Sequence, residues 1–379
     1  METSTSLSIP ETEIRLRVTA LQAMMIEHGL SAIVCFGANR DYAPADLWYL
    51  ARWSTIDEEL SFVFVPASGE TTLITDAPWD VDRAGEEAVA DSIVFDPEPG
   101  DTIAGLIRLQ CRAGDRVGVS GMRSMPARIL DALRAGAVNI EDATWLTEEQ
   151  RMVKSDLELQ LMEEAACISD LGMAAGMDAA LEGVREFEVV AEAEYAIAKA
   201  GGERSFMTVM GSGPRTALMT FLPSERRLSN GDLVILDCGA RISGYHGDMC
   251  RTKVVGEPTG EQRRMLTAVR DALEAGIDAA HPGGRVRDIH DAARSSVAQA
   301  GFGDSWWGDY MPHGAGAGQH EAPIGLADGD VGLRPGMVLC VEPGVGIPGV
   351  GGVILEQMIR ITETGVLVMN SLPLDLWDP

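Results

Sequence analysis

Acidic residues stand at the ends of apolar, strand-like runs in the second half of this chain. Asp237 ends the run LVIL, and Asp248 follows eleven positions later, beyond a turn. Glu342 follows the run MVLCV, and Glu356 follows GGVIL. A carboxylate at the end of a buried strand is costly unless it is paired or bound to a cation. A fold that contains these strands must therefore bring the four carboxylates to a source of positive charge.

The segment PHGAGAGQHEAP, residues 312–323, contains two of the six histidines in the chain. Small residues stand between them, and such residues allow a backbone to approach another group closely. Carboxylates and imidazoles are ligands for hard to borderline divalent ions. Four carboxylates and one imidazole can hold two ions about 3.5 Å apart, an arrangement that orients a hydroxide for attack. The sequence therefore predicts a dinuclear metal site.

The overall charge argues against one class of partner. The chain has 58 Asp and Glu against 30 Lys and Arg, which gives a formal net charge of -28. A nucleic-acid-binding protein needs clusters of basic residues to replace the counterions of the phosphates. The sequence has no such cluster, so we expect no nucleic-acid partner.

The sequence also lacks the signals of membrane proteins and secreted proteins. No apolar run reaches membrane-spanning length. The amino terminus does not show a basic stretch followed by an apolar one, which a secretory signal requires. The six cysteines are scattered without CxxC pairs, a pattern typical of reduced thiols. We expect a cytoplasmic protein with no membrane partner.

The sequence pattern changes near residue 150. Residues 1–150 alternate helical and strand-like patterns, which predicts a small α/β domain without concentrated catalytic side chains. Ser155, followed by Glu158, predicts a capping box that opens a long helix, and a second helix follows directly. Residues 231–256 predict two strands joined by the turn RISG, and two further helices come after them. Residues 151–379 are therefore expected to form an α+β domain.

The motifs of this second domain resemble those of the pita-bread metalloenzymes, a family that includes prolidase, aminopeptidase P, methionine aminopeptidase and creatinase. KSDLEL resembles KS-x-x-E, and DCGARISGYHGDMCRT is similar to the D-x-G…GY…D-x-T-R-T hairpin. PHGAGAGQHEAP matches G-H-G-x-G…H-E-x-P, and RPGMVLCVEPG matches PGM…EPG. The resemblance covers the whole chain. It implies a creatinase-like amino-terminal domain over residues 1–150 and a pita-bread catalytic domain over residues 151–379.

The resemblance also implies a role for each metal ligand. Asp237 and Glu356 would bridge or chelate two divalent ions, and Asp248 would join Asp237 on one of them. His313 and Glu342 would complete the other ion. Manganese, cobalt, iron and zinc all tolerate such ligands, so the sequence leaves the metal open.

An Xaa-Pro peptidase-like metallohydrolase is the activity that the resemblance implies. It would cleave a C–N bond in a dipeptide or a small amide. A hydroxide would attack the carbonyl carbon, His320 would stabilise the oxyanion, and Glu342 would transfer the proton. The family also implies a homodimer, in which the amino-terminal domain helps to close the active site of the neighbouring subunit.

Two other functions fit part of the pattern. The first is a metal-dependent lyase resembling the dimethylsulfoniopropionate-cleaving members of the family. The extra acidic ligand of those members is not evident, because Cys238 and Gly239 follow Asp237. The second is a metal-free pita-bread binding protein, and the complete set of ligands argues against it.

Three positions depart from the pattern of Xaa-Pro peptidases. Thr220 or one of its neighbours aligns with a family histidine, and Ile354 stands where G-G-x-R-I-E has an arginine. Cys250 replaces the first threonine of D-x-T-R-T. The groups that handle a peptide are thus altered while the metal ligands are complete. We expect weak activity on ordinary Xaa-Pro dipeptides and a specialised small substrate.

Further side chains near these motifs are candidates for binding the substrate. His246 is two residues before Asp248 and would share its strand face, where it could replace the missing histidine. The alternative is a histidine at the tip of a hairpin in solvent. Trp306, Trp307 and Tyr310 precede His313. They form either an aromatic wall that packs against the sheet or a substrate pocket, which could bind a cation through its aromatic faces.

Packing or surface positions are expected for most of the other cysteines and histidines near these motifs and helices. Cys238 follows Asp237 directly and should turn away from it into the core. Cys250 and Cys340 are each two residues from a proposed ligand, so they could face the site or pack behind it. Surface positions are expected for three histidines that lie in or near helices: His28, His281 and His290.

Overall fold

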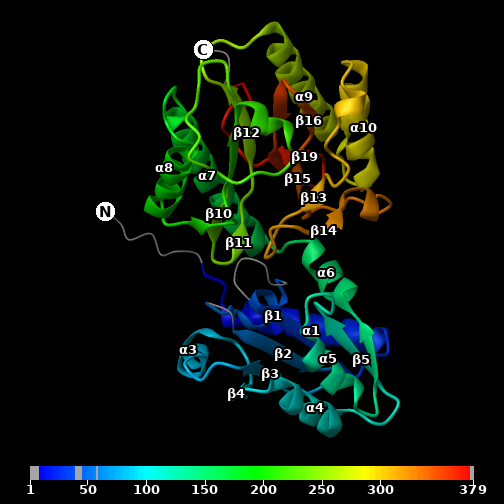
Figure 1. Cartoon of the computed structure of the whole chain (residues 1–379). Coiled ribbons are helices and arrows are strands. Elements are labelled where there is room, and N and C mark those ends of the chain that lie inside the picture. Colours follow the sequence, from blue (N-terminus) through cyan, green and yellow to red (C-terminus); the bar gives the residue numbers. More distant parts are fainter. Residues whose placement is uncertain (1–7, 39–44, 57–58, 376–379) are drawn as a thin grey trace. The chain divides into compact units, whose positions relative to one another are not determined.

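The computed structural model describes residues 8–38, 45–56 and 59–375. The chain forms two compact units, Met1–Arg151 and Met152–Pro379, and Figure 1 shows the course of the chain through both. Each unit has its own sheets and helices, and every predicted site residue belongs to the second unit.

Helices and strands alternate in the first unit. In chain order they are α1 (Glu11–Glu27), β1 (Ala32–Ala38), α2 (Asp46–Ala51), β2 (Leu60–Pro66), β3 (Thr72–Thr75), α3 (Asp80–Glu87), β4 (Ser92–Phe95), α4 (Pro99–Gln110), β5 (Arg116–Ser120), α5 (Ala127–Arg134), β6 (Asn139–Asp142) and α6 (Thr144–Met152). The strands form one mixed sheet in the order β4-β3-β2-β1-β5-β6. Apolar side chains of β1, β2, α4 and α5 form a core on this sheet. The predicted α/β class of this part is confirmed.

Two helix pairs frame the second unit. They are α7 (Asp156–Ala179) with α8 (Glu186–Lys199), and α9 (Gly260–Ala279) with α10 (Val286–Gln299). The predicted capping box opens α7, since the Ser155 hydroxyl accepts from the Glu158 backbone and the Glu158 carboxylate accepts from the Ser155 N–H at 2.8 Å. The other Glu158 oxygen accepts from the Tyr245 hydroxyl at 2.7 Å. The capping glutamate thus also ties α7 to the sheet beside it.

The two helix pairs repeat one design that the sequence analysis did not detect. Gly183 and Gly283 both have φ 85° in the turn between the helices, where a left-handed backbone favours glycine. Arg185 and Arg285 follow, and each is the N-cap residue of the next helix and itself forms an isolated β-bridge. The residues that the two halves share at these positions are mainly glycines and arginines. The duplication is therefore clear in the backbone and faint in the sequence.

Short strands fill the space between the helix pairs. They are β7 (Glu203–Arg204), β8 (Val209–Ser212), β9 (Leu233–Asp237), β10 (Ala240–Ile242), β11 (Tyr245–His246), β12 (Cys250–Val254), β13 (His313–Gly314), β14 (Glu321–Ile324), β15 (Val338–Val341), β16 (Gly344–Ile347), β17 (Gly351–Ile354), β18 (Gln357–Ile361) and β19 (Val366–Val368). In the first half β9 lies between β8 and β12, and in the second half β15 pairs with β13 and β18. The helix pair α7–α8 packs on the first group and α9–α10 on the second, each through its own apolar core. This arrangement confirms the predicted α+β class.

Residues 231–256 differ from the predicted pair of strands. They form four strands, β9 to β12, of which β10 and β11 belong to a separate sheet with β7. The turn RISG is the tip of this small hairpin, with Ser243 and Gly244 at φ 45° and 83°. The chain leaves and re-enters the main sheet at Gly239 and Gly247. A Cβ atom on Gly239 would lie 1.9 Å from the Gly247 carbonyl oxygen, so this crossing requires glycine.

Candidate metal centre and active site

The strand-end carboxylates meet where the two halves of the second unit adjoin. Asp237 ends β9 and lies opposite Cys250 at the start of β12. The Glu356 N–H donates to the Cys250 carbonyl at 3.0 Å, which joins the start of β18 to β12. Asp248 lies two residues before Cys250, the first residue of β12, and Glu342 directly follows β15. Each half therefore contributes one carboxylate after a strand and one before its antiparallel neighbour.

The β13 strand brings a histidine to these carboxylates. His313 lies opposite Cys340 of β15, so the two side chains share one face of the sheet. The His313 Nε2 atom is 3.7 Å from Glu356 Oε1. Asp248, His313, Cys340 and Glu356 each offer one ligand atom, and these four atoms all lie within 4.8 Å of one another.

Burial disfavours the ionised form of these carboxylates when no cation is bound. The pKa values of Asp237, Asp248 and Glu356 are raised well above their usual range, first by burial and then by repulsion from the neighbouring carboxylates. Burial raises the pKa of Glu342 to about 7. Burial also lowers the pKa of His313 to about 3, so its imidazole is neutral, which is the form that binds metal.

Three ligand atoms of this cluster lack a hydrogen-bond partner, which indicates what could stabilise them. Asp237 Oδ1, His313 Nε2 and Glu356 Oε1 are all buried without a hydrogen-bond partner. Most buried polar atoms in folded proteins do have a partner. Three unpaired acceptors of this kind, next to two more buried carboxylates, form a donor set that fits divalent cations.

Tyr310 contacts one of the predicted ligands. Its hydroxyl donates a hydrogen bond of 2.6 Å to Glu342 Oε2. Burial is the main reason that the pKa of Tyr310 is raised, and the Glu342 charge adds to it. The phenol therefore stays protonated and holds the Glu342 carboxylate in place.

The two neighbouring tryptophans pack in different ways. Trp307 lies on the glycine face of the β16–β17 hairpin, where a Cβ on Gly346 would be 1.6 Å from its ring. It packs against an apolar cluster that contains Phe221, Cys250 and Ile354. Trp306 packs edge-on against His290, with ring centroids 5.7 Å apart.

His290 is only 1% exposed, so its predicted surface position is wrong, whereas His28 and His281 are exposed.

His320 lies beside His313, whereas His246 lies on β11 in a separate sheet and does not share a strand with Asp248 as predicted. The His320 ring stands edge-on to His313, with centroids 4.2 Å apart, and burial lowers its pKa. His246 is buried, and its Nδ1 atom shares a hydrogen bond of 2.8 Å with the Ser205 hydroxyl. The alternative of a solvent-exposed hairpin tip is wrong for His246. Burial, aided by the Arg241 charge, lowers its pKa to about 3.

The small residues between His313 and His320 are explained by their neighbours in the protein. A Cβ on Gly314 would lie 2.5 Å from the Ala322 carbonyl oxygen of the adjacent strand. A Cβ on Gly316 would lie 2.2 Å from a Glu321 oxygen. That glutamate forms a buried ion pair with Lys154 at 3.0 Å. These glycines therefore allow the close approach of the adjacent strand and of the ion pair.

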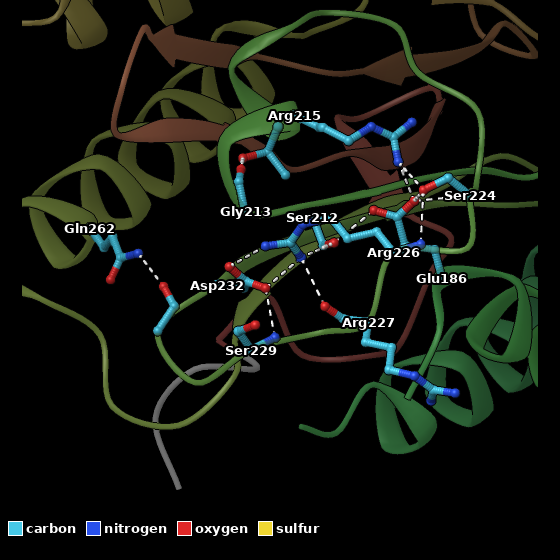
Figure 2. A network of polar contacts seen from close by, with 12 residues as sticks. Glu186, Ser212, Gly213, Arg215, Ser224, Arg226, Arg227, Ser229, Asp232 and Gln262 are labelled. Atoms are coloured by element: carbon cyan, nitrogen blue, oxygen red, sulfur yellow. Dashed lines mark hydrogen bonds and ion pairs between the residues drawn. The ribbon is translucent and has the colours of Figure 1, made fainter. Parts of the chain in front are cut away.

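Thr220 lies on an exposed segment that follows the short helix η1 (Gly213–Ala217). A polar network fixes both ends of this segment, as Figure 2 shows. The buried Glu186 carboxylate accepts from the Ser212 hydroxyl at 2.6 Å, from the Ser224 N–H at 2.8 Å, and from Arg215. Between these anchors, Phe221 inserts into the apolar cluster beside Cys250 and Ile354.

Arg226 connects this network to Asp232, which directly precedes β9 (Figure 2). The Arg226 guanidinium donates to the Ser212 hydroxyl at 2.6 Å and to both Asp232 oxygens, at 2.5 and 2.9 Å. This network could not be predicted from the sequence, because its members are far apart in the chain. The only available signal was an unusual concentration of arginines and serines in residues 212–229.

Arg251 is another important residue that the sequence analysis missed. It is fully buried, and its guanidinium donates to the Glu356 carbonyl at 2.5 Å and to the Leu372 carbonyl at 2.9 Å. It therefore clamps the strand that carries Glu356 to the carboxy-terminal segment. The arginine of the D-x-C-R-T motif was the signal that could have identified it.

All six cysteines are free thiols. As expected, Cys238 is buried in the core of the first half. Across the part of the chain that the structure describes, none of the helices combines the length and the apolar character needed to span a bilayer.

Comparison with known families agrees with this architecture. The model of metallopeptidase family M24 matches residues 160–363, and that of the creatinase/prolidase N-terminal domain matches residues 17–153. An Xaa-Pro dipeptidase of Pyrococcus horikoshii is 34% identical over 64% of this chain and 70% of its own length. A probable dipeptidase, PepE, of Mycobacterium tuberculosis is 31% identical over 87% of this chain and 89% of its own.

Solved structures show the same two-domain fold. The Xaa-Pro dipeptidase of Bacillus anthracis superposes with a TM-score of 0.84 at 29% identity. The match covers 96% of this chain and 99% of that protein.

Proposed function

Because this chain belongs to metallopeptidase family M24 and is therefore a metallohydrolase, we propose that it uses two divalent ions to cleave a C–N bond in a dipeptide or a small amide. The main support is the convergence of unpaired, buried ligand atoms from Asp237, His313 and Glu356. The relatives named above are peptidases. None of them supports a lyase or a metal-free binding protein.

Five residues would hold the two ions: Asp237, Asp248, His313, Glu342 and Glu356. The carboxylates would balance the positive charge, and the neutral His313 imidazole would contribute a nitrogen ligand. When bound, such ions supply Lewis acidity and a nucleophile at neutral pH.

Two side chains of the protein would act on the substrate itself. His320 is exposed beside His313, and its lowered pKa keeps the imidazole neutral, so one ring N–H is available to donate to a developing oxyanion. Glu342 has its Oε2 atom occupied by the Tyr310 hydroxyl. Its Oε1 atom would accept the proton released during attack and pass it to the leaving nitrogen.

We propose a small substrate that differs from ordinary Xaa-Pro dipeptides. Thr220 is exposed and offers no imidazole, and Ile354 is buried beside Phe221 and Cys250. In the family pattern these positions carry a histidine and an arginine. A guanidinium can hold a carboxylate with two hydrogen bonds, whereas an apolar residue disfavours an anion nearby. The preferred substrate would therefore lack a free carboxylate on the side that faces Ile354.

A panel of substrates tests this proposal. Xaa-Pro dipeptides and the matching dipeptide amides are assayed with manganese, cobalt, iron or zinc added, beside a Thr220→His, Ile354→Arg double variant. We expect weak cleavage of the free dipeptides by the parent, better cleavage of the amides, and a gain on free dipeptides in the double variant. Turnover of free dipeptides by the parent at ordinary prolidase rates would refute the substrate proposal.

We also propose a cytoplasmic homodimer. The six free thiols are consistent with a reducing compartment. Leu218, Met219 and Leu222 expose apolar side chains on the segment that follows η1. An exposed apolar patch of this kind is a common part of a protein interface.

A further inference from the structure

Cys340 occupies the middle of the sheet that carries the proposed ligands. It lies on β15, directly opposite His313 of β13 on one side and Met358 of β18 on the other. Directly opposite residues of antiparallel strands project from the same face of a sheet. The Cys340 thiol therefore shares its face with the His313 imidazole.

The sulfur atom lies among ligand atoms and is not simply packed behind them. The Cys340 Sγ atom and ligand atoms of Asp248, His313 and Glu356 all lie within 4.8 Å of one another, and all four residues are buried. His313 and Glu356 are each 1% exposed, and their Nε2 and Oε1 atoms lack a hydrogen-bond partner. Two unpaired buried ligand atoms therefore point to a cation at the position that the sulfur also reaches.

We propose that Cys340 is a metal ligand, so that one of the two ions is held by a thiolate in addition to oxygen and nitrogen atoms. This role of Cys340 rests on the proposed metal site and predicts which class of metal binds there. A soft thiolate favours zinc, and also cobalt or iron, over manganese and magnesium, which prefer oxygen ligands. The thiol proton is released to solvent when the ion binds.

The other buried cysteine near the carboxylates provides a matched control. Cys250 is fully buried beside Asp237, but its Sγ atom faces the Ile354 carbonyl oxygen at 4.0 Å and packs in the apolar cluster with Phe221. A serine at either position is similar in size to the cysteine. Loss of a metal–sulfur signal in Cys340→Ser alone would therefore identify the ligand.

The first experiment uses cobalt as a spectroscopic probe. The full-length protein is stripped with a chelator and titrated with Co²⁺, and its near-ultraviolet absorbance is recorded. We expect a thiolate-to-cobalt charge-transfer band in the parent and in Cys250→Ser, and no such band in Cys340→Ser. Competition between Zn²⁺ and Mn²⁺ should show a preference for zinc that falls by about tenfold or more in Cys340→Ser.

A second measurement does not depend on the folding of a variant. X-ray absorption of the zinc-loaded parent should show a zinc–sulfur distance of about 2.3 Å. Cobalt or zinc binding without a sulfur signal would overturn the role of Cys340 and leave the proposed hydrolase intact. A parent that binds none of these metals would overturn both proposals.

Discussion

His320 and His313 are adjacent rings with different expected roles. Substitution of His320 by alanine removes a donor to the oxyanion and leaves the proposed ligands in place. We expect kcat to fall by about 100- to 1,000-fold with little change in metal content. His313→Ala should instead lose metal. Steady-state kinetics combined with metal analysis separates the two, and His28→Ala serves as an exposed control. Equal metal loss in both variants would contradict the assignment.

Tyr310 offers a second test at the level of one atom. Tyr310→Phe keeps the ring and removes the hydroxyl that donates to Glu342 at 2.6 Å. A hydrogen bond to a charged group contributes about 1.5–3 kcal/mol, so kcat/KM should fall by about 10- to 100-fold. If Tyr310→Phe retains full activity, the hydroxyl does not position Glu342 for catalysis.

The sequence alone predicted some of these residues better than others. The strand-end carboxylates could be identified because a buried charge requires compensation, and Asp248 and Glu356 do lie together with His313. The surroundings of His246 and Trp307 could not be predicted. They depend on the separate β10–β11 hairpin and on the glycine face of β16–β17, which bring distant segments together. Periodicity along one strand carries no information about such contacts.

At the scale of elements, the network of Figure 2 should stabilise the segment that carries Thr220 and Phe221. Arg215→Met leaves the fully buried Glu186 carboxylate without its cationic partner. Because the Arg215 side chain is 33% exposed, we expect a moderate loss of about 1–3 kcal/mol in the free energy of unfolding. Urea denaturation measures it. The exposed Glu188→Gln on the same helix should change stability by less than about 0.5 kcal/mol. Equal effects of the two variants would argue against the network.

Elements were predictable where the signal was local. The Ser155–Glu158 capping box and the helix over Gly260–Ala279 follow from neighbouring residues, and the structure contains both. Residues 231–256 were misjudged because their division into two sheets depends on the close approach of Gly239 to Gly247. That approach joins positions in different strands, and no pattern within one strand reveals it.

At the scale of the whole molecule, removal of metal should lower the thermal stability. Without a cation, burial and then mutual repulsion disfavour the ionised carboxylates of Asp237, Asp248 and Glu356, as their raised pKa values indicate. Free metal at about 100 times its Kd stabilises a protein by about 2.7 kcal/mol, which corresponds to about 5–10 °C in a domain of this size. Calorimetry with a chelator, and then with zinc or manganese restored, measures the shift. Glu356→Ala should show a smaller shift, and an unchanged parent would contradict the metal site.

The assembly state is a further property of the whole molecule. Sedimentation at micromolar concentration should give the mass of a dimer. Leu218→Ser together with Leu222→Ser should weaken that dimer if the exposed segment after η1 lies in the interface. A fully active monomer would rule out the homodimer.

The matched helix pairs with their strand pairs also suggest an ancestry. The first half supplies two aspartates, and the second half supplies two glutamates at the equivalent strand ends. A half-length ancestor with this design would hold only one side of the site, and would complete it by pairing with a second copy across a twofold axis. Gene duplication and fusion would release that symmetry. One side would then be free to acquire the imidazole and the proposed thiol ligand while the other kept only oxygen ligands, so that two unlike ion positions would evolve from one.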